Sequence, residues 1–224
     1  MSAPPGRLIA LEGGEGTGKS TQAERLAHAL GAILTHEPGG TIVGRAIRAL
    51  VLDPELTALD ARAEALLLAA DRAQHLSEVI DPALAEGTWV VTDRFAGSSL
   101  AYQGYGRGLP LEDIEWLSSW ATRQRWPDLS VLLEVPPEEV ARRRRRDDRL
   151  DRLEEEGSSF HARVEAGYRA LALDRPTSWV VVDGSGTPDE VAARVVSAVV
   201  SRLGRPERDG AGAEDQRRDS DRRH

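Results

Sequence analysis

The chain of 224 residues contains no cysteine, no asparagine and a single lysine, Lys19. Without cysteine it can form no disulfide framework, no thiolate zinc site and no cysteine nucleophile, which excludes several classes of enzyme. It has no run of about 18 apolar residues that could cross a membrane, and its first residues lack the charged and apolar regions of a signal peptide. We therefore expect a soluble, cytoplasmic protein without a membrane partner. The position of Lys19 is informative, because it does not stand in a lysine-rich background.

Charge and length narrow the class further. The formal net charge is -8 at pH 7, whereas a general nucleic-acid binder is normally basic, so we expect no nucleic-acid partner. Single cores stop growing near roughly 250 to 300 residues, so we expect one domain, residues 7–203, after a flexible N-terminus, residues 1–6. Residues 204–224 are predicted to be a disordered tail, because from Pro206 onward they cannot bury enough apolar surface to offset the entropy of ordering. A tail that binds a partner is the alternative.

Five short apolar segments alternate with segments of helical spacing. Strands are predicted at residues 7–12, 32–35, 89–93, 131–135 and 179–182. Helices are predicted at residues 20–30, 43–52, 60–85, 111–125, 160–173 and 188–203, and another begins at Pro137. Asp81-Pro82 is expected to break or kink the 60–85 helix near its end, and Thr187 with Glu190 is typical of a helix start. This alternation predicts an α/β fold with three layers, α/β/α, and a five-stranded parallel sheet.

A glycine-rich motif lies between the first predicted strand and the first predicted helix. Residues 13–20 read Gly-Gly-Glu-Gly-Thr-Gly-Lys-Ser and match G-x-x-x-x-G-K-[ST], the P-loop. Glycines let backbone N–H groups wrap a phosphate, and the following helix adds the positive end of its dipole. The motif predicts a P-loop NTPase-type fold in which the ATP phosphates are bound by Gly13, Gly14, Glu15, Gly16, Thr17, Gly18, Lys19, Ser20 and Thr21. A glycine-rich turn with no ligand is the alternative.

Within this loop, Lys19 is expected to reach the β- and γ-phosphates and to be catalytic, and the Ser20 hydroxyl is expected to bind Mg²⁺. The motif alone names a superfamily, which includes kinases and nucleotide-dependent switches. GTP-specific switches usually carry Asn-Lys-x-Asp for guanine, and this chain has no asparagine and no second lysine. A kinase that uses ATP and Mg²⁺ is therefore favoured over a switch.

Four blocks of sequence make the prediction of a kinase more specific. They are Glu-Gly-Gly-Glu-Gly at 12–16, Glu-Pro-Gly-Gly-Thr at 37–41, Leu-Leu-Ala-Ala-Asp-Arg-Ala-Gln-His at 67–75, and Asp-Arg-Phe at 93–95 with Ser-Ser-Leu-Ala-Tyr-Gln-Gly at 98–104. Together they resemble bacterial thymidylate kinases, over about residues 7–203. The resemblance implies transfer of the γ-phosphoryl of ATP to dTMP, giving dTDP and ADP, by a protein that is commonly a homodimer. Kinases for other monophosphates, such as dUMP, CMP or AMP, are the enzymatic alternative.

Two arginines are candidates for the acceptor phosphate. Arg72 and Arg94 each end a short apolar stretch, and two guanidiniums that converge on one phosphate would hold it by bidentate, charge-assisted hydrogen bonds. The resemblance implies this role for both, with help from Arg48, and a catalytic role for Arg94. The alternative for either is an ordinary ion pair, for example between Arg72 and neighbouring carboxylates.

The remaining acceptor contacts are predicted along the same helix and the block that follows. Leu68 lies one helical turn before Arg72 and shares its face, which would bring it close to the base. The family usually has Phe here, so the π-stacking of about 1 kcal/mol is lost. By resemblance, Tyr102 crowds the 2′ position of the sugar, with a core aromatic as the alternative. The resemblance also assigns base contacts to Ser99 and Gln103, and a contact with the sugar 3′-hydroxyl or the metal site to Glu15.

Asp93 ends a predicted strand, as the acidic residue that holds Mg²⁺ through water does in the family. The alternative is that it pairs with Arg94 or caps the next segment. An acceptor phosphate has a second pKa near about 6, so its attacking oxygen is largely deprotonated at neutral pH and no general base is required. His36 and His75 are therefore expected to have surface or structural roles.

An arginine-rich segment, residues 142–156, resembles the lid of those thymidylate kinases that carry transition-state arginines there. This chain fits an arrangement with the arginines in the lid instead of in the P-loop, because residues 14–17 of the P-loop include no basic side chain. Arg149 and Arg152 are predicted to be catalytic. A solvated helix face is favoured for Arg142 and Arg143, and a nucleic-acid patch is the further alternative. Residues 147–156 have no core-forming pattern and are expected to be mobile.

Overall fold

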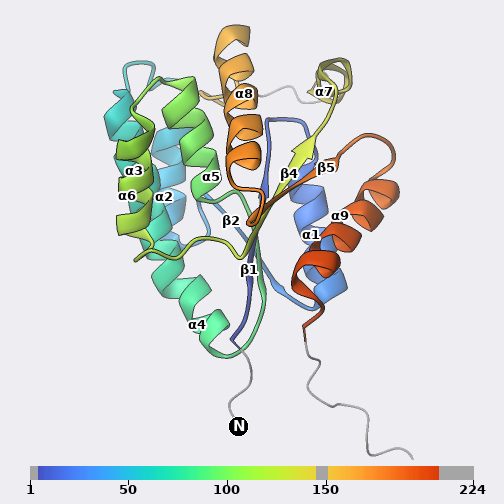
Figure 1. The fold of residues 1–224 in the computed structure, drawn as a ribbon. Helices are drawn as coiled ribbons and strands as arrows, with labels where there is room; N and C mark the ends of the chain where they lie inside the picture. Colours follow the sequence, from blue (N-terminus) through green and yellow to red (C-terminus); the bar gives the residue numbers. More distant parts are fainter. Residues whose placement is uncertain (1–4, 145–150, 207–224) are drawn as a thin grey trace, which may run out of the picture.

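Five parallel strands form the centre of the molecule, in the order β2-β3-β1-β4-β5. The computed structural model describes residues 5–144 and 151–206. Helices cover both faces of the sheet (Figure 1), so the predicted three-layer α/β/α fold with a five-stranded parallel sheet is confirmed. The strands are β1 (Leu8–Glu12), β2 (Ile33–His36), β3 (Val90–Asp93), β4 (Leu129–Glu134) and β5 (Trp179–Asp183).

The alternation of β1 side chains divides the core between the two faces. Ile9 and Leu11 pack against α1 (Lys19–Leu30) and α9 (Pro188–Leu203) on one face. Leu8 and Ala10 point to the other face, which carries α3 (Ala61–His75) and α8 (Ser158–Asp174) (Figure 1). Because β1 is central and pairs with β3 and β4, the P-loop at its end lies beside the end of β3. This is the edge at which parallel sheets usually bind ligands.

The helix predicted over residues 60–85 is continuous but irregular. It runs from α3 through a π-helical turn, η1 (Leu76–Ile80), into α4 (Asp81–Ala85). Proline has no N–H to donate to the preceding turn, and the π turn directly precedes the segment that holds Pro82. The expected break at Asp81-Pro82 is therefore a change of helical pitch. α2 (Ile42–Leu52) packs against α3.

A helical segment that the sequence patterns did not predict follows β3. It comprises α5 (Ala96–Ser99) and a π-helical stretch, η2 (Leu100–Gly106), and leads to α6 (Leu111–Ala121). Its glycines have low helix propensity, but they allow close packing. A Cβ on Gly97 would lie 2.7 Å from the carboxylate of Glu12, and one on Gly106 would lie 2.7 Å from the ring of Phe160.

Two segments expected to be flexible are packed where the structure describes them. The N–H of Gly6 donates to the carbonyl of Leu84 at 2.9 Å, so Gly6, at the end of the predicted N-terminal segment, is held against α4. After α7 (Pro137–Arg144), residues 151–156 contact the rest of the fold through Arg152, which is buried, and Leu153. Residues 145–150 and, from residue 207, the predicted tail lie outside the described residues.

The remaining expectations concern helix starts and membrane segments. Thr187 and Glu190 form the expected capping box at the start of α9. Within residues 5–144 and 151–206, no helix is both long and apolar enough to span a bilayer.

Candidate active site

Two cavities meet at the start of α1, one on each side of the P-loop. The large cavity, of about 490 Å³, is lined by Glu15, Lys19 and Ser20 and by residues of β3, α2, α3 and η2. The small cavity, of about 400 Å³, is lined by Thr17 and Gly18 and by residues of α7 and the β5–α9 loop. The loop thus separates two spaces of the size that small ligands occupy.

The P-loop makes a tight turn into α1. Gly18 has a φ of 91°, in the left-handed region that glycine adopts without steric cost. Lys19 is buried, and its Nζ donates a hydrogen bond to the carbonyl of Gly14 at 2.6 Å. Burial, together with the neighbouring charge of Arg94, lowers the pKa of Lys19 to about 8. An anionic phosphate would stabilise the ammonium group that these surroundings disfavour.

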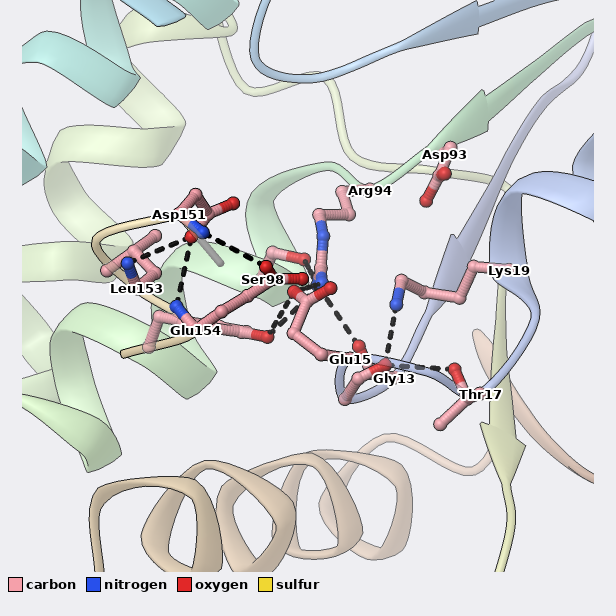
Figure 2. Close-up of polar contacts among 12 residues, drawn as sticks. Gly13, Glu15, Thr17, Lys19, Asp93, Arg94, Ser98, Asp151, Leu153 and Glu154 are labelled. Carbon is pink, nitrogen blue, oxygen red and sulfur yellow. Dashed lines mark hydrogen bonds and ion pairs between the residues drawn. The ribbon is translucent and has the colours of Figure 1, made fainter. Parts of the chain in front are cut away.

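Arg94 follows β3 and directs its guanidinium toward the loop (Figure 2). Nη1 donates to the carbonyl of Gly13 and to the hydroxyl of Tyr168, each at 3.0 Å. Nη2 pairs with Glu15 and donates to the hydroxyl of Tyr102 at 3.2 Å. The residue has a φ of 74°, a conformation that is uncommon outside glycine and is found at functional sites. Glu15, Arg94 and Tyr102, predicted separately, therefore form one cluster.

A buried carboxylate, Glu12, supports this cluster. It accepts hydrogen bonds from Ser98 Oγ at 2.6 Å and from the N–H of Phe95 at 3.2 Å. Burial raises the pKa of Glu12 to about 7, although the Ser98 hydrogen bond and the guanidinium of Arg94 oppose the rise. No role was predicted for Glu12, although a carboxylate that ends an otherwise apolar strand is an informative sequence signal.

Arg72 reaches the large cavity from α3. Its Nε donates to Glu37 Oε2 at 2.8 Å, and its Nη2 donates to Ser99 Oγ at 3.1 Å. The guanidinium lies over the ring of Phe95, 5.4 Å from the centroid. The alternative of an ion pair with a nearby carboxylate is therefore realised, and the pair fixes the guanidinium in the cavity wall.

A buried histidine continues this network. His75 Nδ1 lies 3.0 Å from Glu37 Oε1, and His75 Nε2 lies 2.6 Å from Thr35 Oγ1. The side chain of His75 is fully buried, which agrees with the structural role expected of it. His36 lines the large cavity, and burial lowers its pKa.

Every residue predicted to bind dTMP lines the large cavity. Leu68 also packs with Ile47 and Val51 on α2, so its side chain is part of a fixed apolar wall. Phe95 and Leu153 line the cavity without having been predicted. The predicted residues that the cavity brings together are Glu15, Arg48, Leu68, Arg72, Arg94, Ser99, Tyr102 and Gln103.

The two predicted metal residues lie next to each other. Ser20 Oγ donates to Asp93 Oδ2 at 2.5 Å, whereas Asp93 Oδ1 is buried and has no hydrogen-bond partner among the described residues. The residues that the structure describes contain no group of three or more acidic, histidine or cysteine side chains that could hold a metal. One hydroxyl and one carboxylate suit Mg²⁺, which keeps most of its water and binds substrate phosphates.

Arg152, predicted to be catalytic, contacts α2 and α3 in the structure and makes no hydrogen bond with the P-loop among the described residues. Its Nε donates to the carbonyl of Val51 at 2.9 Å, and its Nη2 pairs with the buried carboxylate of Glu64. A buried carboxylate requires a cation close by, and this need was not visible in the charged stretch of sequence. Arg149, for which the same role was predicted, lies outside the described residues.

Arg143, for which a solvated face was favoured, is instead at the loop. It donates to the carbonyl of Thr17 at 3.1 Å and to the carbonyl of Gly184 at 3.0 Å, and it pairs with Glu139 one turn earlier in α7. Arg143 therefore joins the P-loop to the β5–α9 loop across the small cavity. An arginine run does not show which of its members faces inward.

The fold and these cavities define the class of the protein. A P-loop after the central strand of a parallel sheet, with a ligand-sized cavity on each side, is the arrangement of a P-loop protein that binds a nucleotide and a second ligand.

Comparisons with known proteins name the family. The family model described as Thymidylate kinase matches residues 11–195. A thymidylate kinase of Synechococcus sp. (strain JA-3-3Ab) is 50% identical over 203 residues, which cover 88% of this chain and 96% of the relative. The thymidylate kinase of Trichlorobacter lovleyi is 46% identical over 210 residues, 89% of this chain and 99% of the relative. That of Nitratidesulfovibrio vulgaris is 43% identical over 213 residues, 90% and 99% respectively. The chain belongs to the thymidylate kinase family.

Proposed function

We propose that this chain is a thymidylate kinase that transfers the γ-phosphoryl of ATP to dTMP in the cytoplasm, giving dTDP and ADP. The observation that carries the proposal is that Lys19, Arg72 and Arg94 line one cavity at the edge of the P-loop. One ammonium and two guanidiniums suit an acceptor phosphate that is bound through some of its oxygens while another oxygen receives the phosphoryl group. Membership of the family supports the same reaction.

The donor is proposed to bind along the P-loop with its adenosine in the small cavity. The N-terminus of α1 and the amides of the loop favour a polyphosphate there. Arg143 spans the small cavity from Thr17 to Gly184, so it would lie against the donor. The segment after Asp183 is thus the proposed location of adenine.

The acceptor is proposed to lie along α3 in the large cavity. Its phosphate would be held between Arg72 and Arg94, with Arg48 nearby, since all three line this space. The sugar would then lie beside the cluster of Glu15 and Tyr102. The base would extend toward the remaining predicted contacts, Leu68, Ser99 and Gln103.

The reaction requires charge neutralisation more than proton transfer. No side chain is assigned as a general base, because the acceptor phosphate is largely deprotonated at neutral pH. Lys19 and Arg94 would offset the charge on the transferred group, and Arg149 is proposed to add a further positive charge. Mg²⁺, held by Ser20 and through water by Asp93, would offset the charge of the donor phosphates when bound.

A homodimer is proposed through the face formed by α2, α3 and α6, which lie together on one side of the molecule (Figure 1). Trp116 and Trp120 on α6 are stacked, 6.4 Å between centroids, and both are largely exposed. Large apolar side chains are also exposed on the neighbouring helices, and an exposed apolar patch of this kind marks an interaction site. They are Ile42, Val43 and Leu50 on α2 and Leu66 on α3.

A coupled assay of ADP release across a panel of acceptors tests the activity. With MgATP and dTMP, dUMP, dCMP or AMP, kcat/KM is expected to be highest for dTMP. A higher value for another monophosphate would reassign the acceptor. The panel is needed because Leu68 provides no aromatic ring to stack on thymine. ATP hydrolysis that no monophosphate stimulates would favour a nucleotide-dependent switch.

A further inference from the structure

Glu64 is a fully buried carboxylate that takes no part in the mechanism described above. It accepts hydrogen bonds from Gln103 Nε2 at 2.8 Å and from Arg107 Nη2 at 3.0 Å, and it pairs with Arg152. Gln103 comes from η2 and Arg152 from the segment after residue 150, so Glu64 joins three separate parts of the chain. One of its partners, Gln103, lines the large cavity.

Glu64 lies at one end of a row of side chains on α3. Glu64, Leu68 and Arg72 are four residues apart in turn, so they share one face of the helix. Eight residues correspond to about 12 Å along the helix axis, comparable with the length of a nucleoside monophosphate. If the acceptor phosphate binds at Arg72, its base lies at the Glu64 end of the row, beside Gln103.

Glu64 is an obligatory acceptor for the Gln103 amide. Burial alone would raise the pKa of Glu64, but hydrogen bonds from Arg107, Gln103 and Arg152 outweigh it and hold the pKa below its usual value. An ionised carboxylate has no hydrogen to donate. A flipped amide would therefore place the oxygen of Gln103 against an oxygen of Glu64, with two acceptors facing each other.

The amide of Gln103 is left with one unused acceptor. Gln103 Oε1 is buried and has no hydrogen-bond partner in the part of the chain that the structure describes. Leaving a buried acceptor unpaired is costly, so a ligand that donates a hydrogen bond to it is favoured. The second hydrogen of Nε2, next to this oxygen, can be donated to a ligand carbonyl.

We propose that Glu64 is a positioning residue that fixes the amide of Gln103 so that the site selects a pyrimidine with a hydrogen on N3. This inference rests on the proposed function and deepens it. Thymine and uracil present an N3–H donor beside a carbonyl acceptor, which match the oxygen and the N–H of the fixed amide. Cytosine presents an N3 acceptor beside an amino donor, which requires the flipped amide. Glu64 thus disfavours dCMP as an acceptor without contacting the nucleotide.

The test is the ratio of kcat/KM for dTMP to kcat/KM for dCMP in Glu64→Gln. The new amide can donate or accept, so both orientations of Gln103 become available. The ratio is expected to fall by about tenfold or more, because the orientation that suits cytosine no longer leaves two acceptors in contact. An unchanged ratio in a folded variant overturns the inference.

Two further variants separate positioning from a general loosening of the fold. Arg107→Gln removes another partner of Glu64 but leaves the contact with Gln103, so it should lower Tm and keep the dTMP to dCMP ratio. Gln103→Leu should lower the ratio by itself, and Glu64→Gln should then add no further change in the ratio. A ratio that falls equally in Arg107→Gln, or additive losses in the double variant, would contradict the proposal.

A measurement on the unaltered protein covers the case in which Glu64→Gln does not fold. Side-chain amide spectra should be simple, because the chain has no asparagine and its only glutamines are Gln22, Gln74, Gln103, Gln124 and Gln216. In ¹⁵N-labelled protein, the pair lost in Gln103→Leu should show one hydrogen that exchanges slowly with solvent. Rapid exchange of both hydrogens overturns the inference. Unaltered protein without activity on dTMP would instead overturn the proposed function, so the two failures are distinguishable.

Discussion

The guanidinium of Arg72 and the carboxylate of Glu37 form an ion pair, 2.8 Å between Nε and Oε2, with both side chains 3% exposed. The second oxygen of Glu37 contacts His75, so the carboxylate is fixed from both sides. A buried pair of this kind contributes little to stability by itself. It places a planar donor at the wall of the large cavity, where the acceptor phosphate is proposed to bind.

Arg72→Lys is expected to weaken acceptor binding selectively. Lysine keeps the positive charge beside Glu37 but lacks the planar fork that binds a phosphate bidentately. The KM for dTMP should rise by about tenfold or more, corresponding to at least about 1.4 kcal/mol, while the KM for ATP stays near its original value. Steady-state kinetics with each substrate varied will measure both. An unchanged KM for dTMP would show that Arg72 is only a structural cation.

Lys19→Ala should abolish most turnover without unfolding the protein. Lys19 is the only lysine of the chain, and its ammonium is expected to stabilise charge on the β- and γ-phosphates. A loss of about a hundredfold or more in kcat is predicted, with a Tm close to that of the original protein. Arg25→Ala is a matched control, because this cation of α1 forms an exposed ion pair with Asp189 and should keep its activity. Near-normal turnover of Lys19→Ala would exclude the P-loop mechanism.

Arg149→Ala and Arg152→Ala are expected to affect different properties, turnover in the first and stability in the second. Arg149→Ala should lower kcat by about tenfold or more with a smaller change in the KM for dTMP, because its charge is proposed to act in the transition state. Arg152→Ala should lower the free energy of unfolding by about 3 kcal/mol, because it removes a partner of the buried Glu64 carboxylate. Urea unfolding and steady-state kinetics on both variants will distinguish the roles. A stable Arg152→Ala protein with a selective loss of kcat would instead support the catalytic role predicted from the sequence.

The activity should depend on pH through Lys19. Its pKa, lowered by burial and by Arg94 to about 8, means that the ammonium of the free protein loses its proton as the pH rises through this value. The kcat/KM for ATP should therefore fall above about pH 8, since it reports the free protein. The fall in kcat should lie at higher pH, because bound phosphates favour the charged amine. A kcat/KM for ATP that stays constant to pH 10 would contradict this account of Lys19.

The exposed tryptophans of α6 give a prediction about assembly. Trp116→Glu should shift the protein toward a monomer, because a charge on the proposed interface must be desolvated when two copies associate. Sedimentation equilibrium over a range of concentrations will measure the change. Ala193→Glu is the control, because this exposed residue lies on α9, which covers the opposite face of the sheet from α3 (Figure 1). If the original protein is already monomeric at micromolar concentration, the proposed interface is wrong.

The sequence predicted the elements that have a strong local pattern. All five strands and the P-loop could be placed, because short apolar runs and the Gly-Lys-Ser motif are local signals. Residues 96–106 were not predicted to be helical, because their glycines resemble loop signals while they actually allow close packing. The need for Gly97 becomes visible only when Glu12 lies against it.

The same distinction, between local sequence signals and contacts made only in the folded chain, applies to the residues of the site. Motifs and helical spacing mark Arg72, Arg94 and Leu68, which line one cavity, and their binding roles stay predictions. The contacts of Arg152 and Arg143 could not be predicted, because their partners are distant in sequence. Arg152 pairs with Glu64 in α3, and Arg143 donates to the P-loop and to Gly184. An arginine run identifies available charge, whereas tertiary contacts decide which guanidinium is used.

A crystal structure of the protein with dTMP tests the central claim most directly. The account predicts the phosphate of dTMP in the large cavity, within hydrogen-bond distance of Arg72 and Arg94, with the base beside Leu68 and Gln103. A phosphate bound elsewhere, with Arg72 still paired with Glu37 and Arg94 with Glu15, would contradict it.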